Sequence, residues 1–197
     1  MGVSEWLFMV TLSVLWGGSF FFIEIALKDL PPLTVVLGRV SLAAIALTTF
    51  VLLSGKRIPV SPDLWGKFLV MGALNNLIPF SLIVWGQTRI NSSLAAILNA
   101  TTPVFTVLIA HFFTHDERLT FNRLVGVLLG LCGAIVLIGS EALHGLSLNS
   151  LGQVAILGAA CSYGCAGIYG RRFKKLPSSV AAAGMLTGTT IMMLPLV

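Results

Sequence analysis

Charged side chains are scarce in this sequence: they make up 10% of its 197 residues, against 56% hydrophobic residues. A soluble domain carries about 25% charged residues, so this chain lacks the charge to cover a water-facing surface. A chain of this size also cannot bury every helix on all sides. Together with a mean hydropathy of +0.97, this composition predicts an integral membrane protein.

Groups that support catalysis or metal binding are also few, with three cysteines and three histidines. Cys161 and Cys165 lie one helical turn apart, with no histidine or carboxylate nearby to complete a metal site. The sequence contains no Gly-x-x-x-x-Gly-Lys-Ser/Thr loop and no His-Glu-x-x-His pair. We therefore expect no enzyme activity, no ATP-driven pump encoded in this chain, and neither cofactor nor metal.

A spanning helix needs about 20 mainly apolar residues. On that rule the chain divides into seven segments, which predict an all-α, polytopic helix bundle: about 5–27, 33–54, 65–86, 93–113, 121–139, 151–170 and 178–197. The first segment has no basic region before it and is longer than the apolar part of a signal peptide. We expect it to remain as a membrane helix.

The basic residues, which give a net charge of +5, gather in alternate connections. Nine of the twelve fall on one side of the predicted bundle: Lys56, Arg57, Lys67, Arg118, Arg123, Arg171, Arg172, Lys174 and Lys175. Basic loops stay in the cytoplasm, so this pattern predicts a multi-pass plasma (inner) membrane protein with a cytoplasmic N-terminus. It does not indicate nucleic-acid binding, which needs basic residues interleaved with exposed aromatics.

The sequence contains a weak internal repeat. Leu15-Trp16-Gly17 aligns with Ser162-Tyr163-Gly164, and Leu30-Pro31 aligns with Leu176-Pro177. The connection at Lys28-Asp29, between the first two predicted helices, is neutral. The corresponding connection between the two helices of the second copy is strongly basic. Matched loops of opposite charge character belong on opposite sides of the membrane, which predicts an inverted repeat.

Several motifs occur in a characteristic order: Leu15-Trp16-Gly17-Gly18-Ser19-Phe20, Ala95-Ala96-Ile97, Pro103-Val104-Phe105, Glu117-Arg118-Leu119-Thr120, and the glycines Gly126, Gly130 and Gly133. This order resembles the EamA-type repeat of the drug/metabolite transporter superfamily. The resemblance implies two inverted five-helix repeats. Residues 1–140 would form the first, and residues 149–197 would begin a second that ends early, as expected of a fragment.

Two aromatic residues are candidates for the substrate path. Trp16 lies ten residues after Trp6, about 15 Å further along the first helix and near the membrane midplane. Its repeat counterpart Tyr163 should lie at a similar depth, where transporter sites form between repeats. Helix packing is the alternative role for both.

Glu24 and Arg39 are the charged residues that lie clearly within the predicted spans, away from their edges. A charge at that depth needs a partner or water, so a Glu24–Arg39 pair is one interpretation, as a gate or an ion-coupling site. In the other, Arg39 extends toward the interface and Glu24 pairs with Lys28 one turn away.

Polar residues interrupt the third and fourth segments. The candidates for contact with a polar solute are Asn75, Asn76, Asn99, Thr101, Thr102 and Pro103. Hydrogen bonds between helices are the equally weighted alternative, since buried amides and hydroxyls must find partners in lipid.

Three glycines, Gly126, Gly130 and Gly133, share one face of the fifth segment. Such a face favours close helix contact, either within the monomer or across a homodimer.

The function that the resemblance implies is secondary export or exchange of a small metabolite, such as an amino acid or a drug, by alternating access. The expected partners are the small-molecule substrate and membrane lipid. Nucleotide-sugar or sugar-phosphate carriage remains an alternative within the superfamily. An intramembrane enzyme or a membrane assembly subunit is the alternative from another class.

Overall fold

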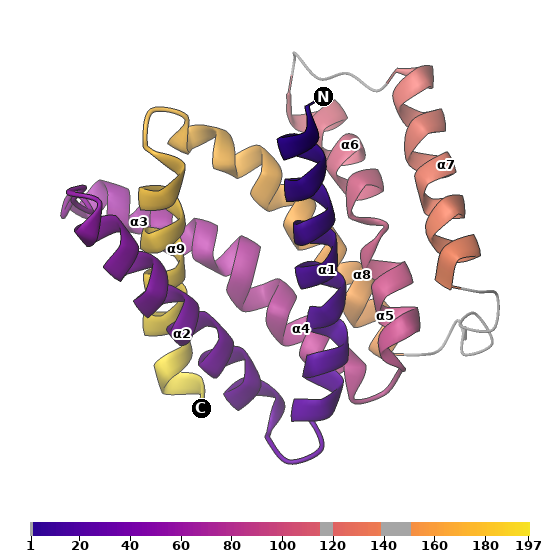
Figure 1. Cartoon of the computed structure of the whole chain (residues 1–197), viewed down its shortest axis with the longest axis horizontal. Helices are drawn as coiled ribbons and strands as arrows, with labels where there is room; N and C mark the ends of the chain where they lie inside the picture. The colour runs from indigo at the N-terminus through magenta and orange to yellow at the C-terminus, as the bar shows by residue number, and fades with distance from the viewer. Residues whose placement is uncertain (1, 115–119, 139–150) are drawn as a thin grey trace.

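The computed structural model describes residues 2–114, 120–138 and 151–197. These residues form helices and no strand, which confirms the all-α fold. In chain order they are α1 (Val3–Ala26), α2 (Pro32–Leu53), α3 (Pro62–Gly72), the π-helix η1 (Ala73–Leu77), α4 (Ile78–Gln87), α5 (Ser92–Asn99), α6 (Thr102–Phe113), α7 (Phe121–Ile138), α8 (Leu151–Tyr169), the 3₁₀-helix η3 (Gly170–Phe173), α9 (Ser178–Met193) and the 3₁₀-helix η4 (Leu194–Leu196) (Figure 1).

Six helical stretches in the described part of the chain are long and apolar enough to cross a membrane: Val3–Ala26, Pro32–Leu53, Pro62–Gln87, Ser92–Phe113, Leu151–Phe173 and Ser178–Leu196. The seventh predicted segment is α7, whose apolar stretch Leu124–Gly133 is shorter. Each predicted segment thus coincides with helix, and the chain is a multi-pass integral membrane protein.

The helix ends follow from local residue chemistry. Pro32 and Pro62 stand in the first turns of α2 and α3, where a missing N–H costs no hydrogen bond. Gly55, with φ of 70°, follows the end of α2 in the left-handed conformation that glycine tolerates. Asn91 caps α5, because its Oδ1 accepts the Leu94 N–H at 2.8 Å.

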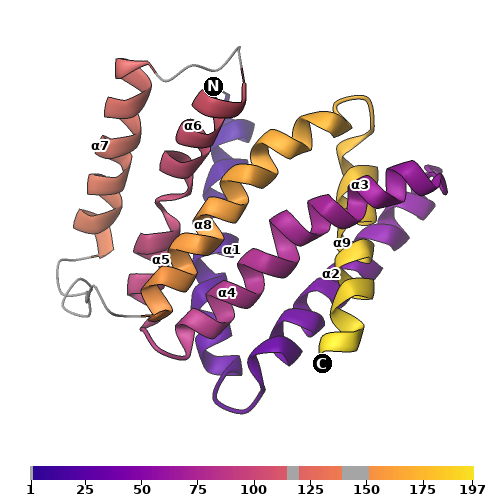
Figure 2. The ribbon, with the colours of Figure 1, turned by 180° about the vertical axis from the view of Figure 1, so that it is seen from behind.

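The second copy of the repeat runs in the opposite direction to the first. In both views α1 descends while α8 ascends, and α2 ascends while α9 descends (Figures 1 and 2). This agrees with the inverted architecture expected from the loop charges. The repeat boundaries at 140 and 149, and the motif residues 117–119, lie outside the described residues.

Helices of the two repeats are interleaved. α8 packs against α4 and α6, while α9 packs against α2 and α3. Glycines allow this closeness: a Cβ on Gly72 would lie 2.7 Å from the Met185 carbonyl oxygen, and one on Gly184 would lie 2.5 Å from the Phe68 ring. The interface between repeats is therefore built on small residues.

The glycine face of α7 does not make the close contact within the chain that we expected. A Cβ at Gly126, Gly130 or Gly133 would meet no described atom within 4 Å. α7 packs on α5 and α6 through its other faces. The spacing predicted a close contact within the chain that the described residues do not form. A glycine face makes such a contact only where another helix lies opposite it, and no described helix lies opposite this one. The homodimer alternative stays a prediction.

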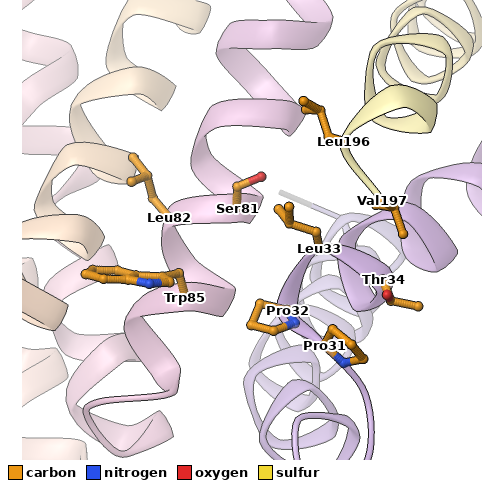
Figure 3. A pocket seen from close by; sticks show the side chains of 9 residues that line it. All are labelled: Pro31, Pro32, Leu33, Thr34, Ser81, Leu82, Trp85, Leu196 and Val197. Atoms are coloured by element: carbon orange, nitrogen blue, oxygen red, sulfur yellow. The ribbon is translucent and has the colours of Figure 1, made fainter.

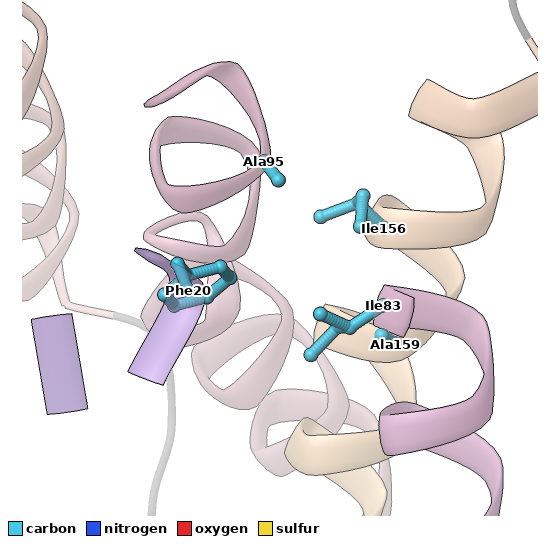
Figure 4. Packing of buried hydrophobic residues seen from close by; sticks show 5 residues of the cluster. All are labelled: Phe20, Ile83, Ala95, Ile156 and Ala159. Atoms are coloured by element: carbon cyan, nitrogen blue, oxygen red, sulfur yellow. The ribbon is translucent and has the colours of Figure 1, made fainter. Parts of the chain in front are cut away.

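One buried cluster joins four helices, and we call it the four-helix core. Its members are Phe20 of α1, Ile83 of α4, Ala95 of α5, and Ile156 and Ala159 of α8 (Figure 4). Ala95, Ile156 and Ala159 are almost fully buried. The packing of these five residues holds the four helices in a fixed relative position. It therefore also fixes the relative heights of the polar residues one helical turn further along.

Candidate functional site

The third span is interrupted by η1, which gives the chain a carbonyl that its own helix cannot satisfy. The Ile78 N–H bonds back to the Ala73 carbonyl, one residue beyond the α-helical partner. In this π pattern the Leu74 carbonyl would accept from residue 79, but Pro79 has no N–H. Ser162 of α8 donates to that carbonyl instead, at 2.7 Å. A side chain of the second repeat thus satisfies a backbone carbonyl of the first.

The two asparagines of η1 make contacts with α9. The Asn76 Nδ2 donates to the Thr189 Oγ1 at 3.2 Å, and the Thr189 hydroxyl donates to the Met185 carbonyl. The Asn75 Nδ2 lies 3.4 Å from the Asn76 Oδ1 and 3.9 Å from the Met185 Sδ. With Asn76 only 2% exposed, these amides serve the interhelical bonding that was the alternative to solute contact.

The fourth span breaks between α5 and α6. Pro103 cannot donate to the Asn99 carbonyl, and the Thr102 hydroxyl does so instead, at 2.7 Å. The Thr101 hydroxyl likewise donates to the Leu98 carbonyl at 2.6 Å. Each threonine therefore uses its single O–H donor to satisfy a backbone carbonyl at the helix break.

Asn99 differs from these neighbours. Its side chain is 9% exposed, and its Oδ1 is buried with no hydrogen-bond partner among the described residues. A buried carbonyl oxygen without a partner costs about 1–3 kcal/mol. Of the four predicted residues at this break, Asn99 is the one whose buried acceptor has no partner among the described residues.

Three of the predicted residues stand one turn from the four-helix core, on the same side of it. α5 and α8 ascend together, so Asn99 follows Ala95 by one turn as Tyr163 follows Ala159 (Figures 1 and 2). α1 descends, so the matching position is Trp16, one turn before Phe20. Tyr163 packs against the core.

Trp16 lies in the exposed N-terminal part of α1. It shares one helical face with the buried residues Phe20 and Ile23, at the i, i+4, i+7 spacing. Yet Trp16 is 58% exposed. A tryptophan with that much free surface is accessible to a solute or to lipid.

Arg39 of α2 joins this level through an aromatic side chain. Its guanidinium carbon lies 4.3 Å from the centroid of the Phe80 ring of α4, and the residue as a whole is exposed. Phe80 precedes Ile83 of the four-helix core by about one turn. We call Trp16, Arg39, Phe80, Asn99 and Tyr163 the central cluster.

Glu24 does not join the central cluster. Within the described part of the chain, Glu24 forms no ion pair with Arg39 or with Lys28; the ion pair found there joins Lys67 to Asp63 at 2.5 Å. Glu24 is exposed on α1. Neither of the two pairings considered from the sequence is formed.

A pocket of about 680 Å³ lies elsewhere, where the α1–α2 connection meets α4 and η4 (Figure 3). Pro31, Pro32, Leu82 and Trp85 are among its lining residues, and Ser81 and Thr34 supply its hydroxyls. None of its lining side chains is charged, and Leu82 also packs against the four-helix core. The two hydroxyls and the Trp85 indole N–H are its polar side-chain groups (Figure 3).

Sequence reasoning missed four residues of this region. Phe80 carried no signal apart from its place one turn after Asn76. Ser162 and Thr189 looked like ordinary small residues of apolar helices. Gln87 is buried, and its Nε2 donates to the Phe20 carbonyl at 3.0 Å; a lone glutamine near a helix end gives no indication of that bond.

Residues 4–139 match the EamA-like transporter family. The chain belongs to this family. That match covers the first repeat and includes four members of the central cluster, Trp16, Arg39, Phe80 and Asn99, while Tyr163 lies in the second.

Individual EamA relatives extend the likeness into the second repeat. The chain is 29% identical over 188 residues to an uncharacterized inner membrane transporter, YedA, of Escherichia coli K12, covering 94% of this chain and 60% of that protein. It is 23% identical to an uncharacterized transporter, YoaV, of Bacillus subtilis, covering 85% of this chain and 58% of that one. It is 30% identical to a probable amino-acid metabolite efflux pump of E. coli K12, covering 81% and 50%.

A solved crystal structure shares the fold, with a TM-score of 0.66 at 19% identity, covering 93% of this chain and 66% of that one. The chain spans between half and three fifths of the length of these curated EamA relatives. Their names describe transporters rather than enzymes.

Proposed function

We propose that this EamA protein is a secondary transporter that exports or exchanges a small metabolite, with an amino acid as the best candidate, by alternating access. The central cluster forms its substrate path. The observations that support this proposal are the Arg39 guanidinium over the Phe80 ring between α2 and α4, the buried Asn99 Oδ1 without a partner among the described residues, and Tyr163 of α8 packed against the four-helix core. Sequence position and helix direction assign Trp16 to the same level. Solute sites between inverted repeats at broken helices are the general arrangement in such transporters.

The two helix interruptions support the same assignment. The π-helix and the α5–α6 break both adjoin the central cluster, and irregular backbone inside a membrane is tolerated where it is buried in protein or faces a solute path. The 30% identity to a probable amino-acid metabolite efflux pump supports the substrate class.

Orientation and coupling belong to the proposal as well. The strong excess of basic residues on the side of the α2–α3 and α8–α9 connections supports a cytoplasmic N-terminus in the plasma (inner) membrane. The described spans contain three carboxylates, Glu5, Glu24 and Asp63, and we propose Glu24 as the proton-binding residue of a coupled cycle. Replacement of Glu24 by Gln should then leave exchange intact and abolish uptake driven by a pH gradient.

The test is counterflow in proteoliposomes that contain the protein at its complete natural length. The panel holds free amino acids, the cationic dye ethidium and a sugar phosphate. The Trp16→Ala and Tyr163→Ala variants should each reduce the initial rate at least tenfold, whereas Trp6→Ala, an equally exposed tryptophan on the same helix, should not.

Equal rates for the Trp16 and Tyr163 variants and the unaltered protein would remove the central cluster from the path. Movement of no panel solute, combined with lipid or peptide hydrolysis, would favour the enzyme alternative.

A further inference from the structure

The C-terminal end of α8, continued by η3, lines two neighbouring grooves. The first, which we call the α6 groove, has a volume of about 370 Å³ and lies between α8, η1 and α6. The second, the α9 groove, has a volume of about 420 Å³ and lies between η3, α3 and α9. Figure 2 shows α8 running between α6 and α3, which separates the two grooves. Both volumes fall within the range of about 300–1,000 Å³ that is usual for small-molecule sites.

The α6 groove is apolar along its length and has one cation at its end. All of its lining residues belong to helical stretches long and apolar enough to cross a membrane. Its charged lining residue is Arg172, whose guanidinium carbon lies 4.8 Å from the centroid of the Tyr169 ring, which lines the same groove. Arg172 is exposed and forms no ion pair within residues 2–114, 120–138 and 151–197. The apolar lining includes Leu74, Ile109, Phe113 and Ile168.

The α9 groove repeats this combination. Its charged lining residue is Lys174, which is exposed, and its apolar lining includes Met71, Ala182 and Met185. No carboxylate that the structure describes lines either groove. Arg172 and Lys174 belong to the α8–α9 connection, the most basic of the chain, so each groove leads from an apolar span to a positively charged surface.

This combination selects an amphiphile with an anionic head. A free phosphate would use the single cation of a groove and leave its apolar walls without a partner. An acidic peptide would carry its own backbone N–H and C=O groups into the apolar part of a span, where they would find few hydrogen-bond partners. A phospholipid satisfies both halves, because basic pockets between membrane helices bind anionic headgroups while the acyl chain covers the apolar wall.

We propose that the two grooves bind anionic phospholipid from the leaflet on the side of the α8–α9 connection, the side predicted to be cytoplasmic. The lipid phosphate lies at Arg172 in the α6 groove and at Lys174 in the α9 groove, and an acyl chain follows the apolar wall of each. This binding does not depend on the proposed transport function.

The experiment is native mass spectrometry of the protein at its complete natural length, in a neutral detergent. Phosphatidylglycerol and phosphatidylcholine with identical acyl chains are the two probes. Each groove should prefer phosphatidylglycerol about fivefold, the contribution of one Lys or Arg near an anionic headgroup. Arg172→Gln and Lys174→Gln should each remove this preference at one groove, and the double variant at both, with phosphatidylcholine binding unchanged. Lys56→Gln is the matched control, because Lys56 is an exposed cation on the same predicted side that lines neither groove.

Two further arms test the apolar walls and the source of the phosphate. Ile168→Trp in the α6 groove and Ala182→Phe in the α9 groove keep every charge but fill space, so each should weaken both lipids at its own groove. Glycerol 3-phosphate in large excess should not displace phosphatidylglycerol, because it has no acyl chain.

Several results would overturn the proposal. They are equal binding of the two lipids, an effect of Lys56→Gln as large as that of Arg172→Gln, displacement by glycerol 3-phosphate, and normal lipid binding in both filled variants. The two grooves give independent tests, so a variant that fails to fold leaves the other groove to decide. Since lipid binding is measured without transport, failure of the counterflow assay would count against the transport function alone.

Discussion

Ser162 of the second repeat donates a hydrogen bond to the Leu74 carbonyl of the first, at 2.7 Å and across 88 residues of sequence. The bond exists because Pro79 deprives that carbonyl of its donor in the π-helix. A proline in one repeat and a serine in the other therefore form one structural unit, which holds the interrupted third span against α8.

This relationship predicts a specific double-mutant result. Ser162→Ala should lower the stability of the protein in detergent by about 1 kcal/mol, the usual effect of leaving a buried carbonyl unpaired. In a Pro79→Ala background the effect should shrink, because residue 79 then supplies an N–H. Thermal unfolding of the single and double variants measures the coupling. Ser13→Ala is the control, because Ser13 donates only to its own helix. Equal losses in both backgrounds would show that Pro79 is not the cause.

The Asn76–Thr189 contact should be measurable in the same way. Asn76→Ala and Thr189→Ala should each destabilise the protein, and their double variant should show a coupling energy of about 0.6 kcal/mol, the average for such bonds in membranes. Purely additive effects would mean that the 3.2 Å contact contributes nothing. Counterflow rates of the folded variants should stay close to normal, since we assign both residues to packing.

Glycine substitutions should separate used from unused glycine faces. Gly72→Ala places a methyl group 2.7 Å from the Met185 carbonyl oxygen and should cost about 1–3 kcal/mol through forced displacement of α9. Gly130→Ala meets no described atom and should be tolerated. Monodispersity on size-exclusion chromatography and the melting temperature are the measurements. If Gly130→Ala were as harmful, or shifted the oligomeric state, the α7 glycines would have a partner in a second copy of the chain.

The membrane orientation can be tested by cysteine labelling of intact cells. In a protein whose native cysteines are replaced, Lys56→Cys and Lys174→Cys should resist an impermeant maleimide, whereas Lys28→Cys and Arg89→Cys should react with it. The expectation follows from retention of basic loops in the cytoplasm. Labelling of Lys56→Cys and Lys174→Cys on opposite faces would contradict the inverted repeat itself.

The sequence was sufficient to predict the helices because the span signal is compositional and long. The opposite helix directions agree with the inversion that loop charge predicts, and the common level of Trp16 and Tyr163 stays a prediction. The sequence did not predict the hydrogen-bond partners of the polar residues. Whether Asn76 bonds to a helix or to a solute depends on Thr189, which lies 113 residues away. Glycine spacing on α7 was equally uninformative, because spacing marks a face and not what opposes it.

The bond between the Gln87 amide and the Phe20 carbonyl attaches α1 to α4 near the C-terminal end of α1. Residues 3–17 are exposed along their whole length, whereas Phe20 and Ile23 are buried. α1 is thus packed into the bundle near its C-terminal end and exposed over the rest of its length. With 1.5 Å per residue, Val3 lies about 26 Å from the anchor at Phe20 and Trp16 about 6 Å, so a tilt of about 10° carries Val3 through about 4 Å and Trp16 through about 1 Å. Any tilt of α1 about this anchor would therefore move its N-terminal end about four times as far as Trp16.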